Sequence, residues 1–361
     1  MTGRFGVTGG TPYRQTGQMM AVSYSAPQTL PVLGTRPDPD CPRDGAVVRV
    51  RATGVCRSDW HAWMGHDPVA LPHVPGHELA GDIASVGDCV RRWSPGDRVT
   101  VPFVCGCGVC GYCRAGDSHV CPEQTQPGFT GPGSFAELVA IHAADTNLVR
   151  LPDAMDYVTA ASLGCRLATA YRALVTHGRL APGQWLAVHG CGGVGLSAIL
   201  VGVALGANVV AVDVSAAARQ RAVDLGATAV PHDAAVSAIR QVTGGGADVS
   251  VDAAGTPSSA VASVRCLRWR GRHIQVGLLF GDQSTPPLPM DLVVAWELSV
   301  HGSHGMPAHQ YGDLLRLVME GTLDPALLVG RVIGLRDAPA ALVAMSRPSE
   351  TTGMTVVRLP G

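Results

Sequence analysis

The sequence has few charges, few aromatic side chains and no long apolar run. Of its 361 residues, 15% are charged and 5% are aromatic, and the formal net charge is −1. A nearly neutral chain offers no basic face for nucleic acid. No apolar stretch approaches the roughly 20 residues that span a bilayer, and the N-terminus lacks a charged segment followed by an apolar one. These absences predict a cytoplasmic protein that binds neither nucleic acid nor a membrane.

What the chain does contain is enough apolar material for two cores. Hydrophobic residues make up 46% of the sequence, which is typical of a compact globular protein. Residues 1–19 are the exception, because they are rich in Gly, Thr and Gln and show no periodicity. We therefore predict that 1–19 form a mobile extension, or that they lie upstream of a start at Met20.

Four of the eleven cysteines are regularly spaced within one short segment. They are separated by two, two and seven residues, and they are Cys107, Cys110, Cys113 and Cys121. Four thiolates so close together repel one another unless a cation holds them, and tetrahedral zinc accepts four sulfur ligands. We predict a closed structural zinc site. A disulfide pair or a reactive dithiol is the alternative, but neither accounts for four such cysteines in a chain without an export signal.

The other cysteines divide into two groups. Cys56 follows a strand-like run, and it forms a possible Cys2His zinc site with His77 and the distant Cys165. Three protein ligands leave one position open, which is typical of a catalytic zinc rather than a structural one. Most of the remaining cysteines are expected to be packing residues, and these are Cys41, Cys89, Cys105, Cys191 and Cys266.

The pattern of elements changes along the chain. The first part has short β-like runs broken by Gly and Pro, at 45–52, 79–86, 97–101 and 133–141. From about 167 to 300, Ala- and Leu-rich helical stretches alternate with Val-rich strands. Such alternation predicts a parallel, doubly wound sheet with helices on both faces.

The first unit of this second part carries a G-x-G-x-x-G motif. A predicted strand at 185–189 leads into Gly190, Gly192 and Gly195, and a helix is predicted at 196–205. These glycines would permit a tight turn, a close approach of a diphosphate and close helix–strand packing. The diphosphate would lie at the helix N-terminus, which favours anions.

The next predicted strand, 208–212, ends at Asp213, eighteen residues after Gly195. A carboxylate there can accept hydrogen bonds from the adenosine ribose and would repel a 2′-phosphate, so the sequence predicts NAD rather than NADP. Two alternatives remain: Asp213 could only cap the next helix, and Arg219 could reach a phosphate. Further strands are predicted at 247–252 and 274–278.

Together these motifs resemble the zinc-dependent medium-chain alcohol dehydrogenases. G-V-C-R-S-D-W-H, P-G-H-E-L-A-G, the four-cysteine segment and the glycine motif occur in that family's order, and the likeness runs from about residue 21 to the end. The resemblance implies an α/β protein with a GroES-like, partly barrel-like β catalytic domain at 20–166 and 304–361. It also implies a Rossmann coenzyme domain, a doubly wound parallel sheet, at 167–303.

The resemblance further implies the reaction. Primary or secondary alcohols and aldehydes or ketones would be interconverted by hydride transfer to NAD, with one catalytic and one structural zinc per subunit. The alcohol proton would leave through Ser58, the nicotinamide ribose and His61. Asp59 would orient the imidazole of His77, and Glu78 would lie behind the zinc.

Coenzyme contacts also follow from the resemblance. They involve Arg57 at the diphosphate, Gly193 and Val194 in the glycine motif, and Val276 and Leu278 at the nicotinamide. Where many relatives carry Arg or Lys before the final strand, this chain has Met354, which weakens the expected anion clamp.

The substrate pocket is expected to include Ser58, Phe103 and Trp60, with Trp63 nearby, although large aromatics often only fill a core. Asp67 before Pro68 replaces the bulky Trp of fermentative microbial enzymes. We therefore expect a roomier pocket than an ethanol-restricted enzyme has.

The segment 287–302 resembles the stretch that joins subunits in relatives, which predicts a homo-oligomer, either a tetramer or a dimer. Two other functions remain as alternatives. One is a quinone or enone reductase of the same superfamily, which would lack catalytic zinc. The other is a zinc-ribbon binding module.

Overall fold

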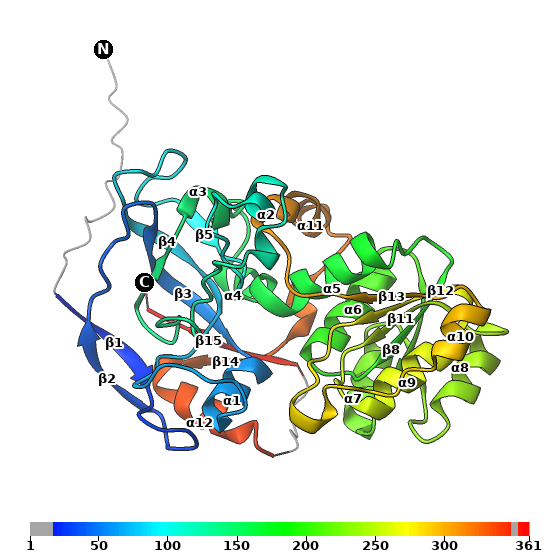
Figure 1. The fold of residues 1–361 in the computed structure, drawn as a ribbon. Coiled ribbons are helices and arrows are strands. Elements are labelled where there is room, and N and C mark those ends of the chain that lie inside the picture. Colours follow the sequence, from blue (N-terminus) through cyan, green and yellow to red (C-terminus); the bar gives the residue numbers. More distant parts are fainter. Residues whose placement is uncertain (1–16, 348–352, 361) are drawn as a thin grey trace, which may run out of the picture.

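The computed structural model describes residues 17–347 and 353–360, which form two lobes side by side (Figure 1). The strands are β1 Gln18–Ser23, β2 Val32–Pro37, β3 Ala46–Val55, β4 Glu78–Val86, β5 Arg98–Thr100, β6 Leu138–Ile141, β7 Val149–Arg150, β8 Trp185–His189, β9 Asn208–Val212, β10 Thr228–Val230, β11 Ala247–Asp252, β12 Leu267–Gln275, β13 Ser299–Gly302, β14 Val329–Gly334 and β15 Met354–Arg358.

Helices of three kinds connect these strands. The α-helices are α1 Arg57–Met64, α2 Gly111–Arg114, α3 Ala144–Asn147, α4 Tyr157–Ala161, α5 Ala168–Arg172, α6 Gly193–Ala204, α7 Ala216–Asp224, α8 Ala235–Thr243, α9 Pro257–Arg265, α10 Met290–Ala295, α11 Tyr311–Met319 and α12 Ala338–Ala344. The 3₁₀ turns are η1 Ser118–Val120, η4 Gly281–Gln283, η5 Ala308–Gln310, η6 Pro325–Leu328 and η7 Leu335–Asp337. The π-helical turns are η2 Leu163–Leu167 and η3 Ala173–His177.

The first lobe is built on a seven-stranded sheet. Its strand order is β14-β15-β3-β4-β5-β7, with β6 paired to β3. The pairs are antiparallel except for β14 with β15. Strand β15 comes from the C-terminal part of the chain and pairs with β3, so this strand belongs to the sheet of the first lobe.

The second lobe is a six-stranded parallel sheet in the order β10-β9-β8-β11-β12-β13, which is the order of a dinucleotide-binding sheet. Successive side chains of a strand point to opposite faces. Accordingly Leu186 and Val188 of β8 pack in the core that includes α6, while Ala187 packs with Ile239 of α8. Helices therefore cover both faces, and the predicted α/β fold with a GroES-like lobe is confirmed. All six strands lie within 167–303, and the exact domain limits stay a prediction.

Several predicted boundaries are wrong. Residues 1–16 lie outside the described residues, but Gln18 and Met19 already belong to β1, because Met19 is buried in a small core. Only the second half of the predicted strand 133–141 is a strand. The helix predicted at 196–205 begins at Gly193. Its first turn contains two glycines, so the sequence there lacks the apolar periodicity that indicates a helix. The strand predicted at 274–278 ends at Gln275 and begins earlier, in an Arg-rich stretch.

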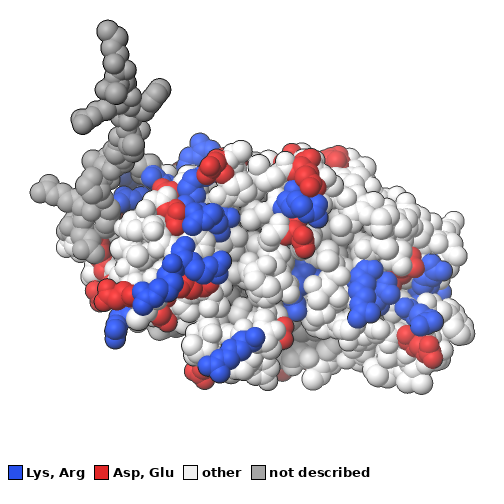
Figure 2. All heavy atoms as spheres, turned by 90° about the horizontal axis from the view of Figure 1, so that it is seen from above, with Lys and Arg blue, Asp and Glu red and all other residues white. Residues whose placement is uncertain are grey.

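The surface agrees with the balanced charge. Basic and acidic side chains are interspersed on the face displayed in Figure 2, and no broad basic area appears on it. Among residues 17–347 and 353–360, none of the helices combines the length and the apolar character needed to cross a bilayer.

Candidate metal centre and coenzyme site

Four buried side chains converge between the two lobes. Their potential ligand atoms all lie within 4.8 Å of one another, and they belong to Cys56, His77, Glu78 and Cys165. Cys56 directly follows β3, and the π-helical turn η2 carries Cys165. Such turns occur frequently at functional sites. The three predicted ligands, scattered over about a hundred residues of sequence, are thus brought together.

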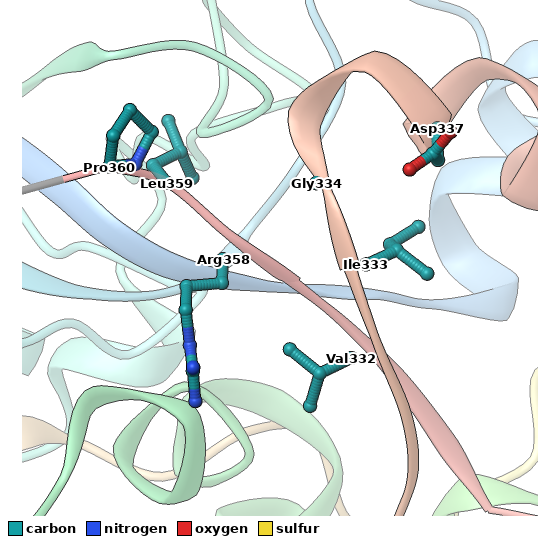
Figure 3. Close-up of a pocket in the computed structure, with 7 residues that line it drawn as sticks. All are labelled: Val332, Ile333, Gly334, Asp337, Arg358, Leu359 and Pro360. Carbon is teal, nitrogen blue, oxygen red and sulfur yellow. The ribbon is translucent and has the colours of Figure 1, made fainter.

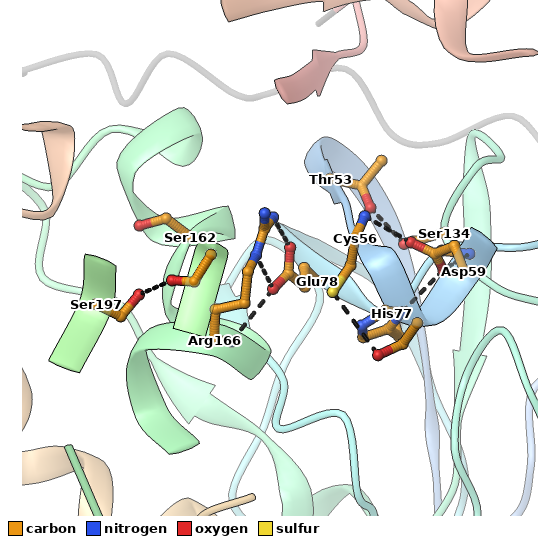
Figure 4. Close-up of polar contacts among 12 residues, drawn as sticks. Thr53, Cys56, Asp59, His77, Glu78, Ser134, Ser162, Arg166 and Ser197 are labelled. Carbon is orange, nitrogen blue, oxygen red and sulfur yellow. Dashed lines mark hydrogen bonds and ion pairs between the residues drawn. The ribbon is translucent and has the colours of Figure 1, made fainter. Parts of the chain in front are cut away.

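The orientation of His77 fits a metal ligand. Its Nδ1 lies 2.8 Å from Asp59 Oδ1, and both side chains are fully buried (Figure 4). The other ring nitrogen, Nε2, is buried without a hydrogen-bond partner among the described residues. Asp59 is itself fixed, since it accepts hydrogen bonds from the backbone N–H groups of Cys56 (2.9 Å) and Gly76 (3.0 Å). One imidazole nitrogen beside two thiols is a donor set that suits zinc.

The two thiols differ in acidity. A hydrogen bond from Cys165 lowers the pKa of Cys56 well below its usual range, and burial only partly opposes this. The same interaction raises the pKa of Cys165. Burial alone would lower the pKa of His77, but the Asp59 carboxylate outweighs it and raises that pKa. Cys56 is therefore the thiol that ionises first.

Glu78 forms a buried ion pair with Arg166, a residue to which the sequence assigned no role. Arg166 Nε donates to Glu78 Oε1 at 2.8 Å, and its Nη2 donates to Oε2. Burial raises the pKa of Glu78, and the guanidinium opposes this rise. Arg166 also reaches the other lobe: a Cβ added at Gly193 would lie 2.3 Å from its Cδ. One side chain thus touches both the metal centre and the glycine motif.

The glycine motif leaves room where a diphosphate would lie. Gly190 has φ of 91°, and a Cβ on Gly195 would lie 1.7 Å from the Gly190 carbonyl oxygen, so both positions require glycine. Gly192 is different, because a Cβ there would meet nothing within 4 Å. Helix α6 begins at this point, with Val194 half-buried in its first turn. An open helix N-terminus is suited to anions.

Asp213 follows β9 directly and is half-buried. Its Oδ2 accepts a hydrogen bond from the Cys191 backbone N–H at 2.7 Å, inside the glycine motif. Its Oδ1 accepts from the Ser215 backbone N–H at 2.8 Å, so the carboxylate also supports the start of α7. Arg219 lies beside it and donates to the Asp213 carbonyl at 2.6 Å. Both predicted determinants of coenzyme choice therefore lie at the tip of β9.

Of the other residues predicted for the site, Ser58 lies beside a metal ligand, whereas His61 and Arg57 contact other residues. Ser58 Oγ lies 3.9 Å from Cys56 Sγ. His61 Nδ1 lies 3.1 Å from His66 Nδ1, and desolvation together with His66 lowers the pKa of His61 to about 4. Arg57 donates to the Met345 carbonyl at 2.6 Å, which differs from the free diphosphate contact expected for it.

The three aromatic residues Phe103, Trp60 and Trp63 lie in different surroundings. Phe103 packs against Cys56 and Cys165, as a wall of a substrate pocket should. Trp60 instead donates to Ser346 Oγ at 2.8 Å, because α1 turns this side chain toward the end of α12. The guanidinium of Arg57 lies over the Trp60 ring. Trp63 is buried in the first lobe's core. That Trp60 lines the substrate pocket stays a prediction.

The four-cysteine lobe is assembled as predicted. The sulfurs of Cys107 and Cys113 are 4.0 Å apart, and those of Cys110 and Cys121 are 3.7 Å apart. Backbone N–H groups of the lobe donate to three of these sulfurs, which stabilises thiolates. All cysteines are free thiols. The group forms a compact, four-sulfur donor set suited to zinc.

Cavities also lie outside these donor sets. One, of about 460 Å³, is formed by β14 and the end of β15, and it is lined by Val332, Ile333, Gly334, Asp337, Arg358, Leu359 and Pro360 (Figure 3). It contains none of the candidate metal ligands. Another lies at the carboxyl ends of β12 and β13 and includes Val276 and Leu278, the residues expected at the nicotinamide.

The fold, the donor sets and the glycine motif define a zinc-binding dehydrogenase. Comparison with known families agrees. Residues 42–153 match the family described as "Alcohol dehydrogenase GroES-like domain", and residues 193–320 match the family described as "Zinc-binding dehydrogenase". The chain belongs to the zinc-type medium-chain dehydrogenase/reductase family and is an oxidoreductase. The family's nicotinamide coenzyme and zinc are therefore expected here, and the donor groups fit both.

The chain is similar to proteins that are named alcohol dehydrogenases or zinc-binding dehydrogenases. An alcohol dehydrogenase of Geobacillus stearothermophilus is 37% identical over 81% of this chain and 86% of its own length. The solved alcohol dehydrogenase TADH from Thermus sp. ATN1 is 29% identical, with a TM-score of 0.88 over 95% of this chain and 100% of its own. A zinc-binding dehydrogenase from Sinorhizobium meliloti 1021, solved with NADP, is 27% identical, with a TM-score of 0.83 over 94% and 99% of the two chains.

Proposed function

We propose that the protein is a zinc-dependent alcohol dehydrogenase that uses NAD and interconverts primary or secondary alcohols with aldehydes or ketones. The observation that carries the proposal is the buried, unpartnered Nε2 of His77 beside the thiols of Cys56 and Cys165, next to an open glycine motif. Zinc, when bound, supplies a Lewis acid that lowers the pKa of an alcohol oxygen, and the nicotinamide supplies the hydride acceptor.

The chain's own residues hold and tune this centre. Cys56, His77 and Cys165 would hold the ion, and Asp59 keeps the His77 ring oriented with Nε2 toward them. Phe103 excludes water on one side. Arg166 compensates the buried charge of Glu78 and places a cation beside Gly193 at the diphosphate position. This cation offsets the loss of the Arg or Lys that Met354 replaces.

Proton release uses Ser58 and His61 in this proposal. Because the pKa of His61 is lowered to about 4, its imidazole is neutral at ordinary pH and can accept a proton only transiently. His66, 3.1 Å away, can pass the proton on. The pair acts as a relay to solvent rather than as a proton store.

NAD is favoured over NADP because the Asp213 carboxylate lies at the ribose position and would repel a 2′-phosphate. Arg219 is committed to backbone carbonyls of the same loop, which limits its reach toward a phosphate. Replacement Asp213→Gly should therefore reduce the ratio of NADP to NAD dissociation constants. An unchanged ratio would mean that another residue sets the preference.

The central experiment combines metal analysis with kinetics. We expect about two zinc ions per subunit in the wild type. Cys165→Ala should lose one zinc and nearly all turnover but still bind NADH, whereas Cys113→Ser should lose the other zinc and some stability. The substrate panel should contain primary, secondary and aromatic alcohols. Full turnover by Cys165→Ala would remove zinc from the chemistry and favour the quinone or enone reductase alternative.

The protein is also proposed to form a homo-oligomer through β13, at the edge of the parallel sheet. Apolar side chains are exposed around it, namely Met290, Val294, Val300 and Trp269. An edge strand flanked by such residues is suited to pairing with a second copy. Val294→Asp should shift the mass measured by light scattering toward the monomer, and a monomeric wild type would contradict the proposal.

A further inference from the structure

The cavity at the carboxyl ends of β12 and β13 has a volume of about 630 Å³. Residues 275–279 and 302–304 form one side of it, and Asp117, His119 and Val120 of the four-cysteine lobe contribute the other. Arg172, at the end of α5, and His177 complete the lining. The cavity therefore lies between the two lobes, where open parallel sheets bind ligands.

Three buried polar atoms of this cavity have no hydrogen-bond partner among the described residues. They are His119 Nδ1, Arg172 Nε and Ser303 Oγ. Their residues are 3%, 8% and 8% exposed, so bulk water does not satisfy them. Buried polar groups are nearly always paired, and three in one cavity point to a polar ligand.

Arg172 contrasts with the other buried arginine of the same helical segment. Arg166 forms its ion pair with Glu78. Arg172 has no carboxylate within 4.0 Å in the described part of the chain, and its Nη1 donates to His177 Nε2 at 2.9 Å. Burial lowers the pKa of Arg172, and the exposed Asp117 only partly opposes this. A buried guanidinium without a counter-ion is costly unless a ligand supplies the anion.

One residue of the cavity lining contacts a side chain beside the metal centre. His304, which lines the cavity, packs edge-on against the Phe103 ring with centroids 5.0 Å apart. Phe103 in turn packs against Cys56 and Cys165. An elongated ligand held at Arg172 would therefore have to pass His304 and Phe103 to reach the metal ligands.

We propose that this cavity binds the anionic end of an elongated substrate, so that the preferred substrates are ω-hydroxy acids or the corresponding ω-oxo acids. The carboxylate would accept hydrogen bonds from Arg172 Nε and His119 Nδ1, while the carbinol end lies beside Phe103. This inference rests on the proposed alcohol dehydrogenase function. The recognition element is a charge-assisted hydrogen bond, for which guanidinium geometry is well suited.

The test compares ω-hydroxyhexanoate with hexanol in the zinc- and NAD-loaded enzyme. We expect the hydroxy acid to have the higher kcat/KM, and Arg172→Gln to raise its KM by about 10- to 100-fold with little change for hexanol. Arg179→Gln, an exposed arginine on the same segment, is the matched control and should change neither. Equal kcat/KM values for the two alcohols in the wild type would overturn the proposal.

Calorimetry provides a second readout that does not depend on turnover. Hexanoate should bind the NAD complex of Cys165→Ala, in which no catalytic zinc is available to its carboxylate, and neutral hexanamide should not. This test does not require Arg172→Gln to fold. If Arg172→Gln instead weakens NADH binding and slows both alcohols alike, the cavity serves the coenzyme carboxamide and the inference is wrong. If neither alcohol is oxidised, the proposed function is wrong. Hexanoate binding still tests whether the cavity binds an anion.

Discussion

Asp59 Oδ1 lies 2.8 Å from Nδ1 of His77, and neither side chain is accessible to solvent. In the neutral ring this contact fixes the tautomer in which Nε2 carries a lone pair, because the carboxylate holds the ring proton on Nδ1. The same carboxylate binds the backbone of Cys56, so it positions two of the three proposed ligands.

Asp59→Asn should therefore weaken zinc binding at the Cys56, His77 and Cys165 site by about 10- to 100-fold, which is typical for the loss of such a supporting contact. Zinc release to a chromogenic chelator would measure it. Asp313→Asn, at an exposed position of α11, is the control. Unaltered zinc retention in Asp59→Asn would show that the contact does not support the metal.

Arg166→Met should destabilise the fold by about 3–5 kcal/mol, because it leaves the Glu78 carboxylate buried and unpaired. The double variant with Glu78→Gln should regain part of that loss. Arg316→Met removes only exposed ion pairs and should cost at most about 1 kcal/mol. Urea unfolding measures all three, and a cost for Arg166→Met no larger than that of the control would argue against a structural role.

Two glycine replacements should have different effects. Gly192→Ala has φ of −77° and free space around the new methyl group, so its stability should change by less than about 0.5 kcal/mol. Its NADH affinity should nevertheless fall, because the methyl group occupies the proposed diphosphate position. Gly195→Ala should be strongly destabilised by contact with the Gly190 carbonyl. Normal NADH binding by a folded Gly192→Ala, followed by fluorescence, would place the diphosphate elsewhere.

Acid should destabilise the second lobe through His189. Desolvation lowers the pKa of this fully buried residue to about 3, from an ordinary value of 6.5. The unfolded chain therefore binds a proton that the folded chain excludes, and stability falls as pH drops from about 6.5 toward 3. The loss is of the order of 4 kcal/mol at the acid end. Urea unfolding at several pH values should show a shallower decline for His189→Gln, and parallel curves would contradict this.

The sequence predicted the parts of this protein whose signals are local. The strands at 185–189, 208–212 and 247–252 have the predicted bounds, because each is a short Val-rich run between turn residues. The spacing of the four cysteines predicted their convergence for the same reason, since short loops leave few ways to arrange them.

Arg166 and Arg172 could not be assigned in the same way. Their roles depend on which charged groups approach them from distant parts of the fold, and Glu78 lies 88 residues from Arg166. The signal available was weak: an arginine directly after a proposed metal ligand, in an otherwise apolar helical stretch. The hydrogen bond from Trp60 to Ser346 could not be predicted either, because it depends on how α1 packs beside the end of α12.

Strand β15 has a consequence for how the metal centre is completed during synthesis. It lies between β14 and β3, and Thr355 pairs with Val55, the residue before Cys56. A growing chain that has not yet added this strand leaves the edge of β3 open, although every proposed zinc ligand has already been made. We therefore expect chains that stop before β15 to hold the ion less firmly than complete chains do.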